Sequence, residues 1–406
     1  MTYLNLHVKN NKMNKLESKT SIIICNFIYH FDINIYLIVA PVLAPIFLPG
    51  HERIVQLIFI YTFLASSNLI RPVGVFLFGY LCLKHHPIKL LKITMLGVGI
   101  SSFAMSVVPT TPRLRIIGAI MILLIRITQA ICAEGEKTIS TLYILEGEDN
   151  KNSIKNNAWL SVAIMCGCSL ASMSGAFVNA NNWRIPFFIG GLLSLYALML
   201  RIDENTPDLQ KRQRNINNTS VSLQSVLLVM FGTALSYVTY DFCFIFINNF
   251  IPLVTNISNK TMVSLNPIFF ITDALLFIPC ALYLKQFDAF KINMIATKLL
   301  AIFSIPLFMF MRNASLPYII FVRFFIITVG VIYSCALNVY LARLFKGQNK
   351  YLIIGFFGSL GLVLFGKPAT PLCLGMFYLT NSILAPPAYL AIIALISHIL
   401  FKKSQE

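Results

Sequence analysis

Apolar runs of about 20 residues follow one another along almost the whole chain, with short polar stretches between them. A helix rises about 1.5 Å per residue, so a run of this length is enough to cross the hydrocarbon core of a bilayer. The runs predict twelve membrane-spanning helices at about residues 21–47, 54–82, 88–108, 115–143, 157–180, 185–200, 223–250, 265–284, 292–311, 316–344, 351–378 and 383–401.

The longest polar connector lies between the sixth and seventh predicted spans, from Arg201 to Ser222. It divides the chain into a six-helix bundle over residues 1–200, which carries an N-terminal tail, a central loop over 201–222, and a second six-helix bundle over 223–406. The predicted fold class is therefore an all-α membrane protein whose twelve transmembrane helices form two six-helix bundles.

Composition supports a membrane protein, because 57% of the residues are hydrophobic and 12% are charged, against about 25% charged residues in soluble domains. The net charge of +17 comes from basic residues that are spread through short connectors, so we expect no nucleic-acid partner.

The nine cysteines lie in or at the ends of apolar runs without metal-site spacing, which favours reduced packing residues. Residues Gly361–Lys367 read G-x-x-x-x-G-K, but Pro368 replaces the Ser or Thr of a phosphate-binding loop. We therefore expect neither an enzyme nor a cofactor other than a coupling proton.

The basic residues predict the orientation, because loops rich in Lys and Arg stay in the cytoplasm. The N-terminal tail, the central loop and the C-terminal end lie on the predicted side that holds most of them. The other side has only Arg53, Arg113, Arg115, Arg184, Lys260 and Arg312. Both termini should be cytoplasmic, and the first apolar run is too long, and too polar at Asp32, for a cleaved signal peptide.

Charged residues inside the predicted spans are candidates for function, because each costs at least a few kcal/mol at membrane depth. They are Asp32, Arg71, Arg126, Glu134, Glu136, Lys137, Asp241, Asp273, Arg323 and Lys367. Asp32 has Asn26, His30, Asn34 and Tyr36 around it in the sequence. A carboxylate in a low-dielectric cavity binds a proton more readily, so Asp32 is a candidate carrier of a coupling proton. The alternative is a salt bridge of Asp32 with Arg71 or Arg126 that sets the register of the helices.

The fourth span places Arg126, Gln129 and Glu136 near one helix face, because they are spaced by three and seven residues. Arg126 could grip a solute carboxylate with two hydrogen bonds, and Glu136 could neutralise it when the site is empty. The alternative is an internal Arg126–Glu136 pair that only joins helices. In the seventh span a polar stripe predicts a second wall of the site, formed by Tyr237, Tyr240, Asp241, Asn248 and Asn249. Lys367 either extends toward the membrane surface or faces the cavity.

Four segments resemble the metabolite:proton symporter family of the major facilitator superfamily, which includes proline/betaine, α-ketoglutarate, citrate and shikimate permeases. The first span is similar to the family's GN-x-x-E-W-[FY]-D-[FY]-x-x-Y pattern at Asn26, Phe31, Asp32 and Tyr36. The second carries RPVGVFLFG, like RP-[IL]-G-x-x-x-FG, and the fourth is similar to R-x-x-Q-G-x-x-x-GGE at Arg126, Gln129 and Glu136. The sixth begins with NWRIPFFIG and ends with LRIDENTPDLQ, like the family's WRIPF and DETP-x-F. These matches cover the first half of the chain in the family's order.

The resemblance implies a twelve-helix fold, alternating access and proton-coupled uptake through the inner membrane of a bacterium. It assigns substrate or proton roles to Asp32, Arg71, Arg126, Gln129 and Glu136. Two departures stand out. Tyr29 and His30 replace the family's Glu and Trp, and Leu83 replaces the acidic residue of a charged loop that latches the two bundles in relatives.

The predicted function is secondary transport, in which protons drive the symport of a small organic solute. A zwitterion of the proline or betaine type is preferred and a di- or tricarboxylate comes next. The alternative is a non-transporting sensor or receptor of the same fold, which the altered loop would favour; a channel lacks support because no filter segment or charged ring is visible.

We expect a monomer in the bacterial inner membrane, with the lipid bilayer and a small-molecule solute as its partners. The candidate substrate- and proton-binding residues are Asp32, Tyr36, Arg71, Arg126, Gln129, Glu136 and Asp241.

Overall fold

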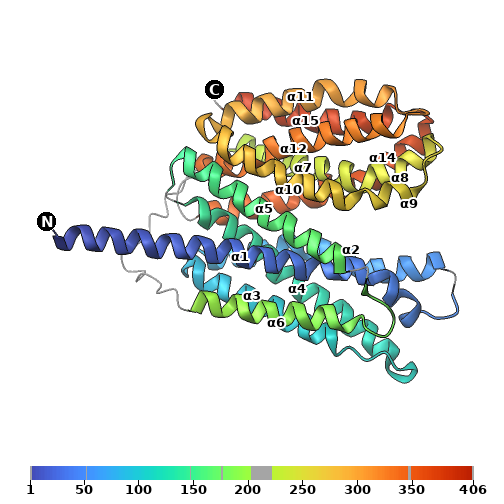
Figure 1. Ribbon diagram of the computed structural model, residues 1–406, viewed down its shortest axis with the longest axis horizontal. Helices are drawn as coiled ribbons and strands as arrows, with labels where there is room; N and C mark the ends of the chain where they lie inside the picture. Colours follow the sequence, from blue (N-terminus) through green and yellow to red (C-terminus); the bar gives the residue numbers. More distant parts are fainter. Residues whose placement is uncertain are drawn as a thin grey trace. The chain divides into compact units, whose positions relative to one another are not determined.

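The computed structural model describes residues 2–51, 53–146, 148–174, 177–202, 222–345 and 349–404. Within these ranges every regular element is helical, and the long helices lie side by side in each part of the molecule (Figure 1). The first half contains α1 (Thr2–Phe47), α2 (Arg53–Leu81), α3 (Pro87–Ser106), the 3-10 turn η1 (Pro112–Leu114), α4 (Arg115–Leu145), α5 (Asn150–Ser174) and α6 (Arg184–Ile202).

In the second half, two of the predicted spans are interrupted. Wide π-helical turns, η4 (Phe242–Phe246) and η6 (Leu362–Gly366), join α7 (Leu223–Asp241) to α8 (Ile247–Val254) and α13 (Asn349–Gly361) to α14 (Ala369–Thr380). The other elements are α9 (Asn259–Ser264), α10 (Asn266–Tyr283), the 3-10 turn η5 (Leu284–Gln286), α11 (Ala289–Met309), α12 (Leu316–Leu344) and α15 (Ala385–Lys403).

The helices confirm the predicted fold class. Ten helical stretches in the described part are long and apolar enough to cross a membrane, from Pro87–Ser106 to Ala385–Lys403, and they coincide with predicted spans three to twelve. Helices α1 and α2 contain the first two predicted spans. Large apolar side chains also point outward, among them Ile116 at 77% exposure and Tyr378 at 84%. Such a surface is suited to lipid, and the protein is a multi-pass membrane protein.

Two helices differ from the predicted spans at their ends. The fifth span was expected at 157–180, but α5 begins at Asn150, where Asp149 Oδ1 accepts a hydrogen bond from the Asn152 backbone. This is an N-cap, and it starts the helix before the apolar run does. The helix ends by Ser174, and the following turn is held by the side chains of Asn179 and Asn182.

The sixth span was expected to end before Arg201, but α6 continues to Ile202 and buries the Arg201 side chain. Most of the predicted central loop, residues 203–221, lies outside the described residues.

The contacts divide the chain into two compact units, and each is described by itself. Unit 1 comprises the described residues of Met1–Ile144 and Ala163–Asn215, and unit 2 those of Leu145–Val162 and Ile216–Glu406. The first half of α5 belongs to unit 2, where Asn157 Nδ2 donates to the carbonyls of Ser334 and Cys335, each at 3.0 Å. The predicted bundle boundaries at residues 200 and 223 stay a prediction.

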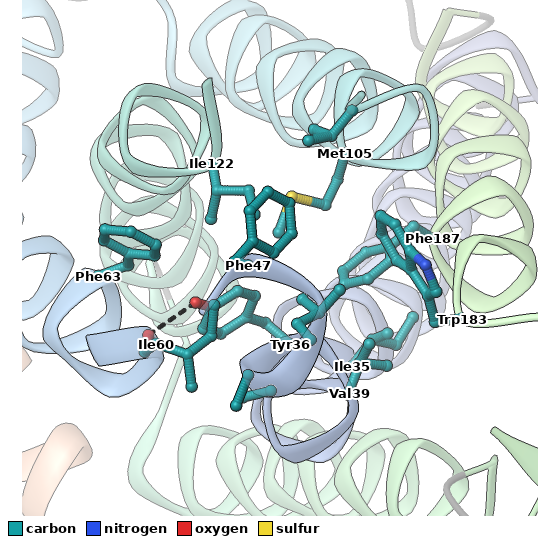
Figure 2. Packing of buried hydrophobic residues seen from close by; sticks show 14 of the residues in the cluster. Ile35, Tyr36, Val39, Phe47, Ile60, Phe63, Met105, Ile122, Trp183 and Phe187 are labelled. Carbon is teal, nitrogen blue, oxygen red and sulfur yellow. Dashed lines mark hydrogen bonds between the residues drawn. The ribbon is translucent and has the colours of Figure 1, made fainter. Parts of the chain in front are cut away.

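Unit 1 has a core in which α1 is surrounded by other helices. Buried side chains of α1, including Tyr36, Val39 and Phe47, pack against Ile60 of α2, Met105 of α3, Ile122 of α4 and Phe187 of α6 (Figure 2). Between helices in lipid, close packing replaces the hydrophobic effect as the main source of association. Gly74 of α2 shows this, because a Cβ there would lie 2.7 Å from the backbone of Ile131 on α4.

Candidate functional site

Asp32 lies in the centre of a buried polar cluster in unit 1. The side chain is inaccessible to solvent, and Ser102 Oγ of α3 lies 2.5 Å from both of its carboxylate oxygens. Gln129 Nε2 of α4 donates to Asp32 Oδ2 at 3.1 Å. Gly190 of α6 provides the space, because a Cβ there would lie 2.2 Å from Asp32 Oδ1. Four helices therefore hold this carboxylate.

Arg126 joins the same cluster through Gln129. Its Nη1 donates to Gln129 Oε1 at 2.5 Å, and its guanidinium lies 4.5 Å from the centre of the Tyr36 ring. Tyr36 is fixed in turn, because its hydroxyl donates to the carbonyl of Ile60 at 2.9 Å, as Figure 2 shows. The Arg126 side chain is buried, and its Nε has no hydrogen-bond partner in the described part of the chain. Gln129 thus bridges a carboxylate and a guanidinium, and the guanidinium keeps an unused donor.

Arg71 belongs to a second cluster, where it forms an ion pair with Glu134 of α4. Asp32 forms neither of the two salt bridges considered from the sequence, with Arg71 or with Arg126. Its hydrogen bonds come from Ser102 and Gln129 instead. His30 of α1 lies against the Tyr29 ring, and its Nε2 is buried without a hydrogen-bond partner in the described structure.

Glu136 lies apart from Arg126, contrary to the prediction that the two would neutralise each other. Arg201 of α6 binds both of its oxygens, at 2.9 and 2.7 Å, and Thr94 Oγ1 of α3 donates to it at 2.7 Å. The reason is distance along α4: ten residues separate Glu136 from Arg126, which amounts to about 15 Å of helix rise. This cluster joins α3, α4 and α6 at one end of unit 1.

In unit 2, polar residues gather where α7 and the α13–α14 helix are interrupted. Asp241, the last residue of α7, accepts a hydrogen bond from Thr370 Oγ1 of α14 at 2.5 Å. Lys367 follows η6 directly, and its Nζ donates to Tyr237 Oη at 2.8 Å while lying 4.4 Å from the centre of that ring. Lys367 is therefore directed at α7, and the view that it extends toward the membrane surface is wrong. Breaks of this kind are frequent at functional sites.

The rest of the polar stripe predicted on the seventh span is dispersed. Tyr240 packs against Phe244 and Phe270, and Asn249 bonds its own helix at the carbonyl of Ile245. Asn248 Nδ2 donates to Asn266 Oδ1 of α10 at 3.1 Å, in a separate cluster. Tyr237 and Asp241 join the group around Lys367, and the Tyr240 ring lies 5.9 Å from the Tyr237 ring, centre to centre.

Several partners escaped prediction from the sequence. Ser102, Thr94 and Thr370 are hydroxyl residues within apolar runs, and such residues carry no signal of their own. Arg201 falls in the predicted central loop because a polar sequence follows it. Among the described residues, no group of three or more His, Cys, Asp or Glu side chains is placed to hold a metal ion.

Comparisons with known proteins agree with this architecture. The sequence profile of the Major Facilitator Superfamily matches residues 22–366. The chain is 31% identical over 191 residues to the proline/betaine transporter of Salmonella typhimurium, an alignment that covers 45% of this chain and 38% of the relative. A glycine betaine/proline/ectoine/pipecolic acid transporter of Dickeya dadantii is 30% identical over 180 residues, with 42% and 36% covered. These alignments therefore span less than half the length of the relatives.

A longer alignment reaches a Staphylococcus haemolyticus protein provisionally named as a proline/betaine transporter, with 26% identity over 401 residues, 91% of this chain and 83% of the relative. Among solved structures, the proton:xylose symporter XylE superimposes with a TM-score of 0.76 at 15% identity, covering 97% of this chain and 95% of that one. The fucose:proton symporter FucP, in its outward conformation, gives 0.74 at 10% identity, with 97% and 100% covered. At these identities the superpositions establish the fold.

Proposed function

Because this chain belongs to the Major Facilitator Superfamily and is a membrane transporter of that fold, we propose that it carries out proton-coupled symport of a small zwitterionic solute of the proline or betaine type. The observation that carries the proposal is the bridge Asp32–Gln129–Arg126, in which one buried amide touches both a carboxylate and a guanidinium. A change of charge on Asp32 is thereby transmitted to a cation that can bind a solute.

Asp32 can alternate between its ionised and protonated forms without losing its partner. A hydroxyl group both donates and accepts, so Ser102 Oγ can donate to the carboxylate or accept from the carboxylic acid. Gln129 Nε2, by contrast, only donates, and its hydrogen bond is stronger to the charged form. Protonation of Asp32 would therefore loosen Gln129 and, with it, the hydrogen bond that Gln129 accepts from Arg126.

Arg126 supplies the group for a solute carboxylate. It is buried, it keeps Nε available, and the aromatic ring of Tyr36 lies against its guanidinium. In unit 2, Lys367 and Asp241 offer one group of each charge beside aromatic Tyr237, which is a set suited to a solute that bears both charges. The names of the relatives, which transport proline and betaines, support a zwitterion over a polyanion.

The remaining features follow the expectation from the sequence. The proposed transporter lies in the inner membrane of a bacterium with both termini in the cytoplasm, acts as a monomer by alternating access, and uses no cofactor besides the coupling proton. Asp32, Tyr36, Arg71, Arg126, Gln129, Glu136 and Asp241 remain the proposed residues. We assign Glu136 a supporting role, because Arg201 occupies both of its oxygens.

The test is uptake of radiolabelled proline and glycine betaine into proteoliposomes that hold the purified chain. We expect accumulation under an inward proton gradient, loss of accumulation with a protonophore, and competition by the other zwitterion but not by α-ketoglutarate or citrate. Asp32→Asn should abolish proton-driven accumulation while leaving exchange of labelled for unlabelled solute. Asp149→Asn is the matched control, because Asn serves as an N-cap as well as Asp does. Accumulation that survives collapse of the proton gradient would refute proton coupling.

A receptor of the same fold that does not transport is the second candidate. Asp32, Arg126 and Glu136 are all buried and engaged in hydrogen bonds, and Tyr29 and His30 replace the family's Glu and Trp. The same proteoliposomes separate the two functions, because a receptor would bind zwitterions without accumulating or exchanging them.

A further inference from the structure

Unit 2 contains a buried arginine whose hydrogen bonds are largely unmade. Arg323 lies two turns into α12, its side chain is 0% exposed, and its Nη2 donates to Asn266 Oδ1 of α10 at 2.7 Å. The guanidinium lies 4.0 Å from the centre of the Phe269 ring, which covers one face. Nε and Nη1 have no partner among the described residues. One of the five N–H donors of this group makes a hydrogen bond within the described residues, and four are left over.

The charge of Arg323 is also unbalanced. No carboxylate in the described part of the chain forms an ion pair with it. Asp241 is held by Thr370, and Asp273 lies seven residues beyond Asn266 on α10, about 10 Å along the helix axis. A buried cation without a counter-charge, and with unused donors, is among the costliest arrangements in a protein interior.

We propose that Arg323 is the centre of a binding site for a small monovalent anion in unit 2, where the first turn of α10 packs against α12 two turns from its start. The anion takes its hydrogen bonds from Nε and Nη1 of Arg323, while Asn266 holds Nη2 and Phe269 closes the site on one side. A halide ion or a carboxylate supplies the missing charge and the missing acceptors. This site is distinct from the Lys367 and Asp241 cluster and does not depend on the proposed transport.

The main experiment follows thermal unfolding of the purified full chain in detergent while chloride replaces gluconate at constant ionic strength. A ligand that binds only the folded state raises the transition temperature in a saturable way. We expect such a rise for the wild type and none for Arg323→Met. Arg343→Gln removes the same charge from an exposed position on the same helix, and it should respond as the wild type does. A wild type without a saturable response, or an Arg323→Met variant that responds equally, would overturn the site.

Direct binding keeps the test decisive should Arg323→Met fail to fold. Equilibrium dialysis of the wild-type chain with radioactive chloride should show about one site per chain, with binding weakened at least tenfold in Arg323→Lys, which lacks the planar set of donors. Absence of specific chloride binding to the wild type would mean that water satisfies the guanidinium, and the proposal would be wrong.

The same dialysis distinguishes the two sources of the anion. Proline that displaces labelled chloride competitively identifies the natural occupant as a solute carboxylate. Displacement by bromide and nitrate but not by proline identifies a free inorganic anion. Both results support the site at Arg323. Failure of proline transport in proteoliposomes would refute the proposed function alone and leave the chloride measurement intact.

Discussion

Arg201 of α6 donates hydrogen bonds from both Nη atoms to the carboxylate oxygens of Glu136 on α4, at 2.9 and 2.7 Å, and both side chains are buried. Because removal of one partner leaves the other as a buried, unpaired charge, Arg201→Met should lower the free energy of unfolding by about 3–5 kcal/mol. The double variant Arg201→Met/Glu136→Leu should recover much of this loss. Denaturant or thermal unfolding in detergent provides the measurement, and a double variant as unstable as the single one would show that the loss does not come from a buried, unpaired Glu136.

Only glycine fits at position 190 without displacing the Asp32 carboxylate, since a Cβ there would lie 2.2 Å from Oδ1. Gly190→Ala should displace the carboxylate from Ser102 and Gln129 and reduce proton-driven uptake at least tenfold. Gly375→Ala is the matched control, because nothing lies within 4 Å of its Cβ position and Ala favours a helix by about 1 kcal/mol over Gly. Equal uptake by both variants, at equal amounts of folded protein, would contradict the importance of this contact.

Gln129 is expected to couple the two charged groups of unit 1. Gln129→Met keeps the size of the side chain but removes its three hydrogen bonds, to Asp32, to Ser102 and from Arg126. We expect solute exchange to continue while accumulation driven by a proton gradient falls at least tenfold. The comparison of exchange with accumulation in the same proteoliposomes checks this, and a parallel loss of both would indicate a general disturbance of the fold.

Lys367 and Tyr237 allow a graded test in unit 2. Tyr237→Phe removes the hydroxyl that accepts from Nζ but keeps the ring beneath it, whereas Lys367→Met removes the charge. The solute concentration at half-maximal uptake should rise roughly tenfold for Lys367→Met, which corresponds to about 1.4 kcal/mol, and less for Tyr237→Phe. Choline, a cation without a carboxylate, should be recognised equally by the wild type and Lys367→Met if Lys367 binds the carboxylate.

The sequence predicted the fold well because each span is a long apolar run whose length is set by the bilayer. It predicted the cluster of Arg126 and Gln129 because a separation of three residues places both on one helix face. It could not place Glu136, since its partner Arg201 lies on another helix and local spacing says nothing about such contacts. Nor could it show the hydroxyl groups of Ser102 and Thr370 as ligands of carboxylates, because serine and threonine are common in membrane helices for several reasons.

The π-turn η6 has a consequence for how the second half of this chain evolves. The backbone of Lys367 bonds the carbonyl of Leu362, five residues back, at 2.7 Å. This part of the helix therefore carries one residue more than an α-helix of the same length. Loss of a single residue between Leu362 and Gly366 would restore regular α-helical hydrogen bonding and leave the residues on either side in nearly the same orientation, whereas the same loss within a regular α-helix turns everything after it by about 100°. A deletion in η6 would therefore keep Lys367 facing Tyr237, while a deletion in α13 would turn it away.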